Sequence, residues 1–326
     1  MELKTPLTFS HVYSSAPWGG GWIRTLFGRT DAPDICSESW EVSGHPFGMS
    51  RMKNGPYAGC SLADLTEKFG TALTGTKAPV PGRFPLLIKL LDARRSLSVQ
   101  VHPSEANASL TGGEPKTEAW VVLAAAPGAA LYAGAEPGTS EESFRAAVAH
   151  GEAMVGTLSR HAVKDGDALY IPGGVVHAIG AGCLIYEVQQ SSNTTYRFYD
   201  WDRVDALGKS RPLHIEQAFK SLDLGFPPVH LHRARNPQAQ GLNMWRTYIH
   251  SPFFTIRELT LADEVEIPLD GSTFLSLFVL DGGVKVTSGG ESVEVMRGSS
   301  ALVPADAGAC RLKARISATK LLVTTL

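Results

Sequence analysis

Residues 96–102 read Ser-Leu-Ser-Val-Gln-Val-His, a strict alternation of polar and apolar side chains. In a β-strand this period of two places Ser98, Gln100 and His102 on one face and the intervening Leu and Val residues on the other. Similar alternation, or short runs rich in Val, Ile and Leu, recurs along the chain between turns rich in its 33 glycines and 20 prolines. These patterns predict an all-β fold with an antiparallel core.

Short helices interrupt the predicted strands. The pattern Ser61-x-x-Asp64 is typical of a helix start, and the helix it opens runs through Phe69. Thr139-x-x-Glu142 opens a second helix, and residues 214–222 form a third. We therefore expect a β-rich protein with a few short helices.

The length of 326 residues corresponds to about two domains. Residues 230–240 are polar and contain Pro237, which makes them the best candidate for a linker. We therefore predict a first domain over residues 1–235 that carries the functional site, and a second, β-rich domain over residues 236–326.

The two β-rich blocks share a faint internal repeat. Two pairs of segments match in spacing, namely residues 166–172 with 298–304 and residues 120–123 with 277–280. In this alignment His177 falls on Ala309 and Glu118 falls on Leu275. If the repeat is real, the second copy has lost its polar site.

Charge and targeting signals exclude several classes of protein. Thirty basic and 32 acidic side chains give a net charge of −2, so no large positive field recruits nucleic acid or anionic lipid. The uncharged runs at residues 119–135 and 168–186 contain Pro and Gly and read as buried strands rather than membrane helices. The first ten residues lack a secretion signal, and the four cysteines form no Cys-x-x-Cys pair. We expect a cytoplasmic protein, and the sequence indicates no oligomeric state.

A second alternating stretch adds charged groups to the first. In residues 116–120 the period of two places Lys116 and Glu118 side by side. His177 follows a Pro-Gly-Gly turn in an otherwise apolar strand pair, where an unpaired imidazole would be costly.

Together these stretches supply two histidines, one carboxylate and one amide: His102, His177, Glu118 and Gln100. Nitrogen and oxygen donors of this kind suit one zinc ion, whose remaining position stays open for water or substrate. The alternative is that His102 caps the turn before Pro103, while His177 and Glu118 satisfy each other inside the core.

Downstream, residues 187–203 are dense in aromatic and hydrogen-bonding side chains, which suggests a lined cleft. Arg197 alternates with its aromatic neighbours, so its guanidinium can face the interior that receives His177 and contact a phosphate in bidentate fashion. The alternative is a surface arginine paired with Asp200 or Asp202.

Taken together, these motifs resemble type I mannose-6-phosphate isomerases in their shorter bacterial form. The matching stretches are residues 97–103 (LSVQVHP), 116–120 (KTEAW), 171–180 (IPGGVVHAIG), 184–190 (LIYEVQQ) and 194–203 (TTYRFYDWDR). Upstream, Trp18-Gly-Gly and residues 38–46 and 53–57 are similar to the opening strands of the family. The resemblance spans roughly residues 5 to 225.

The resemblance implies a cupin fold, a small jelly roll, followed by a second cupin whose site is degraded. It implies one zinc ion per chain. The residues it assigns are, for the metal, Gln100, His102, Glu118 and His177; for catalysis, Arg197, Lys116 and Glu187; and for substrate binding, Ser98, Lys89, Trp18, Glu38 and His45.

The activity it implies is the interconversion of mannose 6-phosphate and fructose 6-phosphate through a cis-enediol or enediolate, with a sugar phosphate as the only partner. Glu187 is the candidate base for proton transfer between C1 and C2. Two other functions remain open: a zinc-containing cupin that binds or senses a sugar phosphate without turnover, and a non-haem iron oxygenase, against which Gln100 argues mildly.

Overall fold

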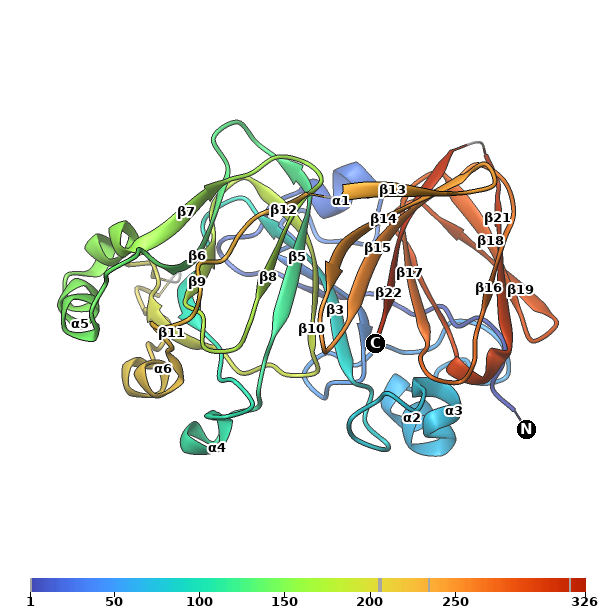
Figure 1. Cartoon of the computed structure of the whole chain (residues 1–326), viewed down its shortest axis with the longest axis horizontal. Helices are drawn as coiled ribbons and strands as arrows, with labels where there is room; N and C mark the ends of the chain where they lie inside the picture. Colours follow the sequence, from blue (N-terminus) through green and yellow to red (C-terminus); the bar gives the residue numbers. More distant parts are fainter. Residues whose placement is uncertain (1, 205–206, 234, 317) are drawn as a thin grey trace.

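The computed structural model of the chain describes residues 2–204, 207–233, 235–316 and 318–326. Two β-sandwiches lie side by side, the first in blue to yellow and the second in orange to red (Figure 1). Every strand pair in them is antiparallel, and the helices are short. The predicted all-β class with a few short helices is confirmed.

The first sandwich consists of a seven-stranded and a five-stranded sheet. The larger sheet has, in spatial order, β1 (Val12–Ser14), β2 (Glu38–Ser43), β3 (Leu86–Ala93), β10 (Cys183–Gln190), β5 (Glu118–Ala125), β8 (Asp167–Ile171) and β12 (His232–Arg233). The smaller sheet has β11 (Tyr196–Tyr199), β4 (Val99–Val101), β9 (His177–Ile179), β6 (Ala130–Ala135) and β7 (Leu158–Ala162). The uncharged runs 119–135 and 168–186 thus form buried strands joined by turns, as predicted.

The second sandwich consists of a six-stranded and a four-stranded sheet. The larger has β13 (Arg235–Gln240), β14 (Asn243–His250), β15 (Thr255–Leu261), β22 (Thr319–Thr325), β17 (Leu275–Asp281) and β20 (Ser300–Val303). The smaller has β16 (Val265–Pro268), β21 (Ala309–Ala314), β18 (Gly283–Ser288) and β19 (Glu291–Met296).

The three predicted helices are all present, and the structure contains further short helices that were not predicted. The helices are α1 (Trp22–Phe27), α2 (Leu62–Phe69), α3 (Thr71–Thr74), α4 (Ala108–Thr111), α5 (Glu141–Ala149), α6 (Ile215–Ser221) and the 3-10 helices η1 (Gly151–Thr157) and η2 (Ala305–Ala307). The predicted capping box of Ser61 and Asp64 is present at α2. At α5 the cap lies one residue later than predicted, because Ser140 Oγ accepts the Ser143 N–H. None of the described helices is long and apolar enough to cross a membrane.

The predicted linker at residues 230–240 is wrong over most of its length. Residues 232–233 form β12, which pairs with β8, and residues 235–240 form β13, which pairs with β14. Ala234 lies outside the described residues. Polar composition did not prevent strand formation, because both short strands lie at sheet edges, where side chains remain in water.

Four hydrophobic clusters hold this arrangement together, one of which packs α5 and α6 against the smaller sheet of the first sandwich around Phe198. Of the other three, one fills the first sandwich around Trp120, and another fills the second around Leu277. The third lies between the two large sheets, where the rings of Tyr186 and Phe278 are 5.5 Å apart and the Tyr186 hydroxyl lies 3.1 Å from Thr324 Oγ1. Burial of apolar surface between the sheets joins the two sandwiches.

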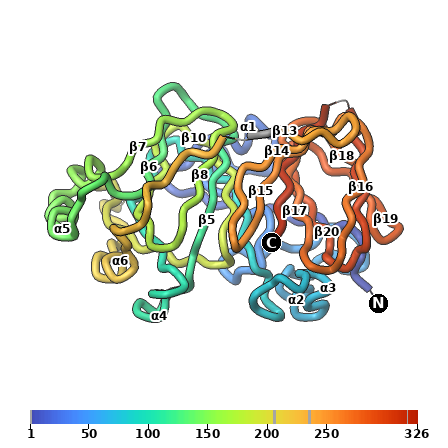
Figure 2. The backbone as a smooth tube through the Cα atoms, in the orientation of Figure 1, coloured from blue at the N-terminus to red at the C-terminus, as the bar shows by residue number. Residues whose placement is uncertain are grey.

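The start of the chain also contacts the second sandwich. Leu7 forms a β-bridge with Leu302, and Ser288 Oγ donates to the Lys4 carbonyl. In Figure 2 the N-terminal end accordingly lies beside the second sandwich, far from the first. The beginning of the first sequence block therefore packs against the second sandwich.

The internal repeat is present in the structure, since the two large sheets share the strand order of β3-β10-β5-β8 and β15-β22-β17-β20. The register matches as well. In the first sandwich Glu118 pairs with Ile171, and in the second Leu275 pairs with Val303, as the sequence alignment requires. The small sheets correspond in the same way, β4-β9-β6-β7 to β16-β21-β18-β19.

Candidate metal centre and active-site cavity

Neighbouring strands of the first sandwich bring the four predicted metal ligands together. Gln100 on β4 pairs directly with His177, the first residue of β9, and His102 follows β4 on the same face as Gln100. Glu118 begins β5 in the opposite sheet. His102, Glu118 and His177 are buried, and one donor atom from each lies within 4.8 Å of the others.

The donor atoms converge closely on one point. His102 Nε2 lies 3.3 Å from Glu118 Oε2, and His177 Nε2 lies 3.4 Å from Glu118 Oε1. Gln100 Nε2 is 3.3 Å from His177 Nε2, while Ser98 Oγ donates to Gln100 Oε1. Because the two ends of an amide are assigned from their hydrogen bonds, a 180° rotation would turn the Gln100 carbonyl oxygen toward the histidines.

The protonation of His177 makes this cluster a candidate cation site. His177 Nδ1 lies 2.8 Å from the Val175 carbonyl oxygen, so Nδ1 carries the proton and Nε2 is a bare acceptor. Burial lowers the pKa of His177, which keeps the ring neutral. Nε2 therefore faces Glu118 Oε1 with no proton between them, and both carboxylate oxygens of Glu118 lack a hydrogen bond. Two acceptors in such contact favour a positive ion.

The alternative, in which His177 and Glu118 satisfy each other, does not account for these contacts. A neutral imidazole whose proton is on Nδ1 has no donor for Glu118. The donor set instead fits a divalent ion: two imidazole nitrogens, one carboxylate and one amide oxygen are ligands that zinc accepts. Glu118 is fully buried, and while its Oε2 pairs with Lys116 Nζ at 2.7 Å, its Oε1 faces only the bare His177 Nε2 and has no donor, which a metal would satisfy.

Lys116 lies against this cluster, as the strand alternation predicted. Its Nζ is 2.7 Å from Glu118 Oε2 and 3.1 Å from His102 Nε2. Burial alone would raise the pKa of Glu118, but Lys116 and His102 hold it well below its usual range. Burial and the positive charge of Lys116 lower the pKa of His102 to about 3, so this ring is a neutral ligand. The carboxylate is thus ionised and both imidazoles are available as donors.

A cavity of about 190 Å³ opens beside the cluster. It is lined by eight of the twelve residues predicted for the site: Trp18, Glu38, Lys89, Ser98, Gln100, Lys116, Glu187 and Arg197. His102, Glu118 and His177 form the buried metal cluster described above. The structure therefore gathers eleven of the twelve predicted residues in one place.

Arg197 points into the cavity rather than pairing with the nearby acids. Asp200 accepts hydrogen bonds from Arg203 and Arg211, and Asp202 accepts one from Tyr199. Arg197 Nε is buried without a hydrogen-bond partner, and its backbone pairs with Gln100 across β11 and β4. A guanidinium in this state is ready to bind an anionic group in the cavity.

Three polar lining residues were not identified from the sequence: Asn193, Thr195 and Arg211. Asn193 and Thr195 precede Arg197 at steps of two, so the alternation that placed Arg197 could have found them. Arg211 has no such signal. It follows a turn, and two hydrogen bonds to Asp200 hold it near the cavity.

Glu187 is a buried carboxylate on the cavity lining whose pKa is raised. Burial, followed by the charge of Glu118, raises the pKa of Glu187 to about 6, although Lys116 and Lys89 oppose the shift. Its Oε2 accepts a hydrogen bond of 2.9 Å from Trp120 Nε1, and its Oε1 lies 3.8 Å from Lys89 Nζ. A buried carboxyl group that titrates near neutrality suits proton transfer.

Glu38 shares Lys89 with Glu187. Lys89 Nζ is 3.4 Å from Glu38 Oε2 and lies 4.5 Å from the centroid of the Trp40 ring. Burial would raise the pKa of Glu38, but Lys89 keeps it below its usual value, so Glu38 is ionised. The pKa values of the two carboxylates are thus shifted in opposite directions because their surroundings differ.

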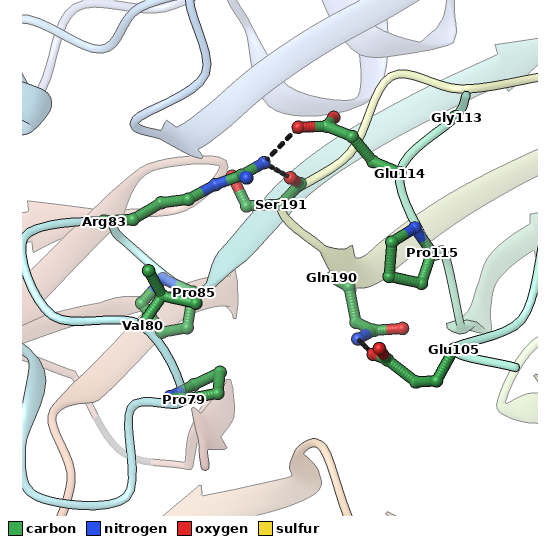
Figure 3. Close-up of a pocket in the computed structure, with 10 residues that line it drawn as sticks. All are labelled: Pro79, Val80, Arg83, Pro85, Glu105, Gly113, Glu114, Pro115, Gln190 and Ser191. Carbon is green, nitrogen blue, oxygen red and sulfur yellow. Dashed lines mark hydrogen bonds and ion pairs between the residues drawn. The ribbon is translucent and has the colours of Figure 1, made fainter. Parts of the chain in front are cut away.

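His45 lies outside the lining of this cavity. Its Nε2 is 3.5 Å from Glu114 Oε2, on the side of a separate groove of about 340 Å³. Figure 3 shows this groove, where Arg83 reaches both Glu114 and the backbone oxygen of Ser191. Among the twelve predicted residues, His45 is therefore the one that the structure places apart.

Comparison with known proteins agrees with this architecture. The family model of the phosphomannose isomerase type I catalytic domain matches residues 7–128, and that of the mannose-6-phosphate isomerase cupin domain matches residues 244–321. The chain is 39% identical over 307 residues to the mannose-6-phosphate isomerase of Streptococcus mutans, covering 93% of each sequence. It is 34% identical to the mannose-6-phosphate isomerase ManA of Bacillus subtilis, covering 94% of this chain and 96% of the relative.

The fold comparison leads to the same family. The crystal structure of the mannose 6-phosphate isomerase from Bacillus subtilis superposes with a TM-score of 0.88 at 29% sequence identity, and the match covers 99% of this chain and 100% of the other. The cupin fold expected from the sequence is thereby confirmed. With sequence relatives and fold in agreement over nearly the whole length, the chain belongs to the type I mannose-6-phosphate isomerase family of enzymes.

Proposed function

We propose that this protein binds one zinc ion through Gln100, His102, Glu118 and His177 and interconverts mannose 6-phosphate and fructose 6-phosphate. The observation that carries the proposal is the fully buried Glu118, whose Oε1 faces the bare His177 Nε2 without a donor, beside a cavity lined by Arg197, whose Nε is buried without a hydrogen-bond partner. Membership of the family supplies the substrate pair.

When bound, the zinc ion supplies a positive centre that polarises oxygen atoms on the sugar. The four side chains carry a single negative charge in total, that of Glu118, so the occupied site stays net positive. Lys116 lies on the carboxylate side of this centre and adds a further positive charge. The cavity is therefore suited to hold an enediolate, in which negative charge develops on oxygen.

Glu187 is proposed to move the proton between C1 and C2. Isomerisation through a cis-enediol requires a base that removes a proton from one carbon and returns it to the other, and a carboxyl group with a pKa of about 6 is well matched to both steps. The hydrogen bond from Trp120 Nε1 orients the carboxylate and leaves Oε1 toward the cavity cations. Arg197 is proposed to hold the anionic oxygen that forms at the reacting end of the sugar.

The remaining residues are proposed to hold the rest of the substrate. Ser98 and Lys89 are assigned to the phosphate, and Trp18 and Glu38 to the cavity wall. His45, which lies beside Glu114, is assigned a supporting role at the wall from outside the cavity lining. Cationic contacts to a phosphate remote from the reacting carbons lower the barrier by orienting the open chain.

We also propose that the enzyme acts in a reducing compartment, the cytoplasm. The cysteines Cys36, Cys60, Cys183 and Cys310 are all free, and three of them are buried. Burial raises the pKa of the Cys36, Cys183 and Cys310 thiols to about 12, so they behave as apolar core groups.

The test is a coupled assay of fructose 6-phosphate formation from mannose 6-phosphate, run before chelation, after chelation and after zinc is returned. We expect activity to disappear and then to return. The Glu187→Gln variant should bind zinc normally but lose most turnover, whereas the exposed Glu142→Gln variant should match the wild type. Well-folded, zinc-loaded protein that binds fructose 6-phosphate without exchanging its substrate proton with deuterated water would overturn the isomerase proposal in favour of a sensor. Oxygen uptake by the iron-loaded protein would overturn the isomerase proposal in favour of an oxygenase.

A further inference from the structure

The second sandwich contains a cavity of its own, at the place that corresponds to the metal cluster of the first. The cavity has a volume of about 690 Å³ and is lined by Pro268, Asp270 and Leu275, among others. Pro268 pairs with Ala309 as Gln100 pairs with His177, and Leu275 occupies the position of Glu118. The second sandwich therefore lacks the side chains that correspond to the proposed metal ligands but retains a cavity at the same place.

A cation stands in this cavity at the position of Lys89. In the first sandwich Lys89 pairs with Glu187, which pairs with Trp120. In the second, Arg257 pairs with Val323, which pairs with Leu277. Since Leu277 corresponds to Trp120 in the repeat, Arg257 corresponds to Lys89.

The partners of the two cations differ. Lys89 lies between the carboxylates of Glu38 and Glu187, whereas the corresponding positions beside Arg257 are Trp245 and Val323. The Arg257 guanidinium carbon lies 4.4 Å from the centroid of the Trp245 ring. No hydrogen bond or ion pair from the Arg257 side chain is found within the described part of the chain. Loss of the acidic neighbours leaves this cation free to bind an anion.

The other groups around the cavity also favour a negative ligand. Lys77 lies on the lining, and the one acidic side chain among the described lining residues is the exposed Asp270. Hydrogen bonds from Ser272 lower the pKa of Asp270, and the charge of Lys77 adds to this effect, so Asp270 is ionised and its charge offsets that of Lys77. The hydroxyls of Thr247, Ser272 and Thr325 line the same space and are donors for phosphate oxygens.

We propose that the cavity of the second cupin is a binding site for a small phosphorylated molecule, with Arg257 as its main anion contact. A guanidinium stacked on an indole presents its planar edge to two phosphate oxygens, which is the geometry that favours arginine over lysine. The volume lies within the range of small-molecule pockets. The site is separate from the metal centre, and the proposal does not depend on the activity proposed above.

The Trp245 indole gives a local probe of this site. Its Nε1–H donates to Gln240 Oε1, and its ring contacts the guanidinium, so its indole NMR signal should shift when an anion reaches Arg257. Inorganic phosphate is titrated into the full-length, metal-loaded protein at constant ionic strength, and the signal is assigned with the Trp245→Phe variant. We expect a saturable shift, and glucose 6-phosphate should bind more tightly than inorganic phosphate because its sugar can contact the hydroxyls.

Matched variants decide the outcome. Arg257→Gln should weaken binding at this signal by roughly tenfold or more, corresponding to about 1.4 kcal/mol, and Thr247→Val should weaken it less. Arg315→Gln, which removes an exposed arginine paired with Glu294, should leave it unchanged. Isomerase activity without added anion should be retained in all three, which also shows that they fold. A Trp245 signal that does not saturate with either probe, or equal affinity in Arg257→Gln, would overturn the proposal.

Discussion

Glu118 and Leu275 occupy the same position in the two sandwiches: Glu118 pairs with Ile171 across β5 and β8, and Leu275 pairs with Val303 across β17 and β20. One position of a repeated fold thus carries a buried carboxylate in the first copy and an apolar side chain in the second. Leu275 packs into the core of the second sandwich, where a carboxylate without a cation would be costly. The candidate metal cluster is confined to the first copy by this difference and by Pro268 and Ala309.

Replacement of Glu118 by glutamine should release the metal. The amide keeps the shape of the side chain but removes the only negative charge among the four proposed ligands, so we expect bound zinc to fall well below one equivalent per chain. Metal analysis of dialysed, folded protein measures this. The Glu142→Gln variant on α5 is the control, because its carboxylate is exposed and distant from the cluster. Full zinc retention in Glu118→Gln would remove Glu118 from the ligand set.

Replacement of Arg197 by lysine should reduce turnover while the fold is kept. A lysine preserves the charge but not the planar pair of donors, so we expect kcat to fall by roughly 100-fold, the scale of losing one donor to a developing oxyanion. Steady-state kinetics and thermal unfolding measured together check this. Arg145→Lys, on the exposed surface of α5, should behave as the wild type. A near-normal kcat in Arg197→Lys would show that the planar pair of guanidinium donors is not needed for turnover.

Arg29 and Glu41 form a buried ion pair, and both residues hydrogen-bond to the second sandwich. Breaking this pair should destabilise the protein. Arg29 donates to both oxygens of Glu41 and to the Gly298 carbonyl, and Glu41 Oε2 accepts from Ser300 Oγ. Arg29→Met leaves Glu41 buried and unpaired, so we expect a loss of about 3–5 kcal/mol in the free energy of unfolding.

Urea denaturation with fluorescence detection measures this loss. The control is Arg311→Met, which breaks the exposed contacts of Arg311 with Glu264 and Glu266 and should change stability by less than about 1 kcal/mol. Equal effects of the two substitutions would show that the buried pair contributes no more than an exposed one.

The same pair predicts a loss of stability in acid. Burial would raise the pKa of Glu41, but Arg29 holds it below the ordinary value of 4.5. Since the folded pKa is below the unfolded one, the stabilisation is present above the unfolded pKa and is lost as the pH falls through the folded pKa. We expect unfolding free energy to decline below about pH 4.5, and less steeply in Glu41→Gln than in the wild type. Parallel pH profiles of the two proteins would contradict this assignment.

We propose that the boundary between the two cupin domains lies at residues 235 and 236, as the sequence predicted. β13, which begins at Arg235, belongs to the second sandwich, so the proposed boundary lies within one residue of the start of that strand. The interface core and the Arg29–Glu41 pair make the two parts interdependent, and Leu7 adds a contact from the chain start. Separate expression of residues 1–235 should therefore give unstable protein.

The local sequence pattern was sufficient to predict several strands of this protein and the side chains that share a face on them. The alternation in residues 96–102 and 116–120 predicted both the strands and the side chains that share a face, because in a strand that relationship depends only on the period of two. The register of the repeat also followed from matched spacing. The positions of Gln100, His102, Glu118 and His177 around one point agree with those predictions.

Only the tertiary structure decided which residues meet across sheets. The resemblance named Lys89 and Glu38, but the ion pair between them depends on the neighbouring register of β2 and β3. Arg211 reaches the cavity through Asp200, and His45 turns to Glu114, which local sequence does not reveal. Within the polar segment, residues 232–233 and 235–240 form edge strands because unpaired strand edges were available to them. A strand's own sequence determines which face a side chain occupies, whereas sheet order and packing determine what that face meets.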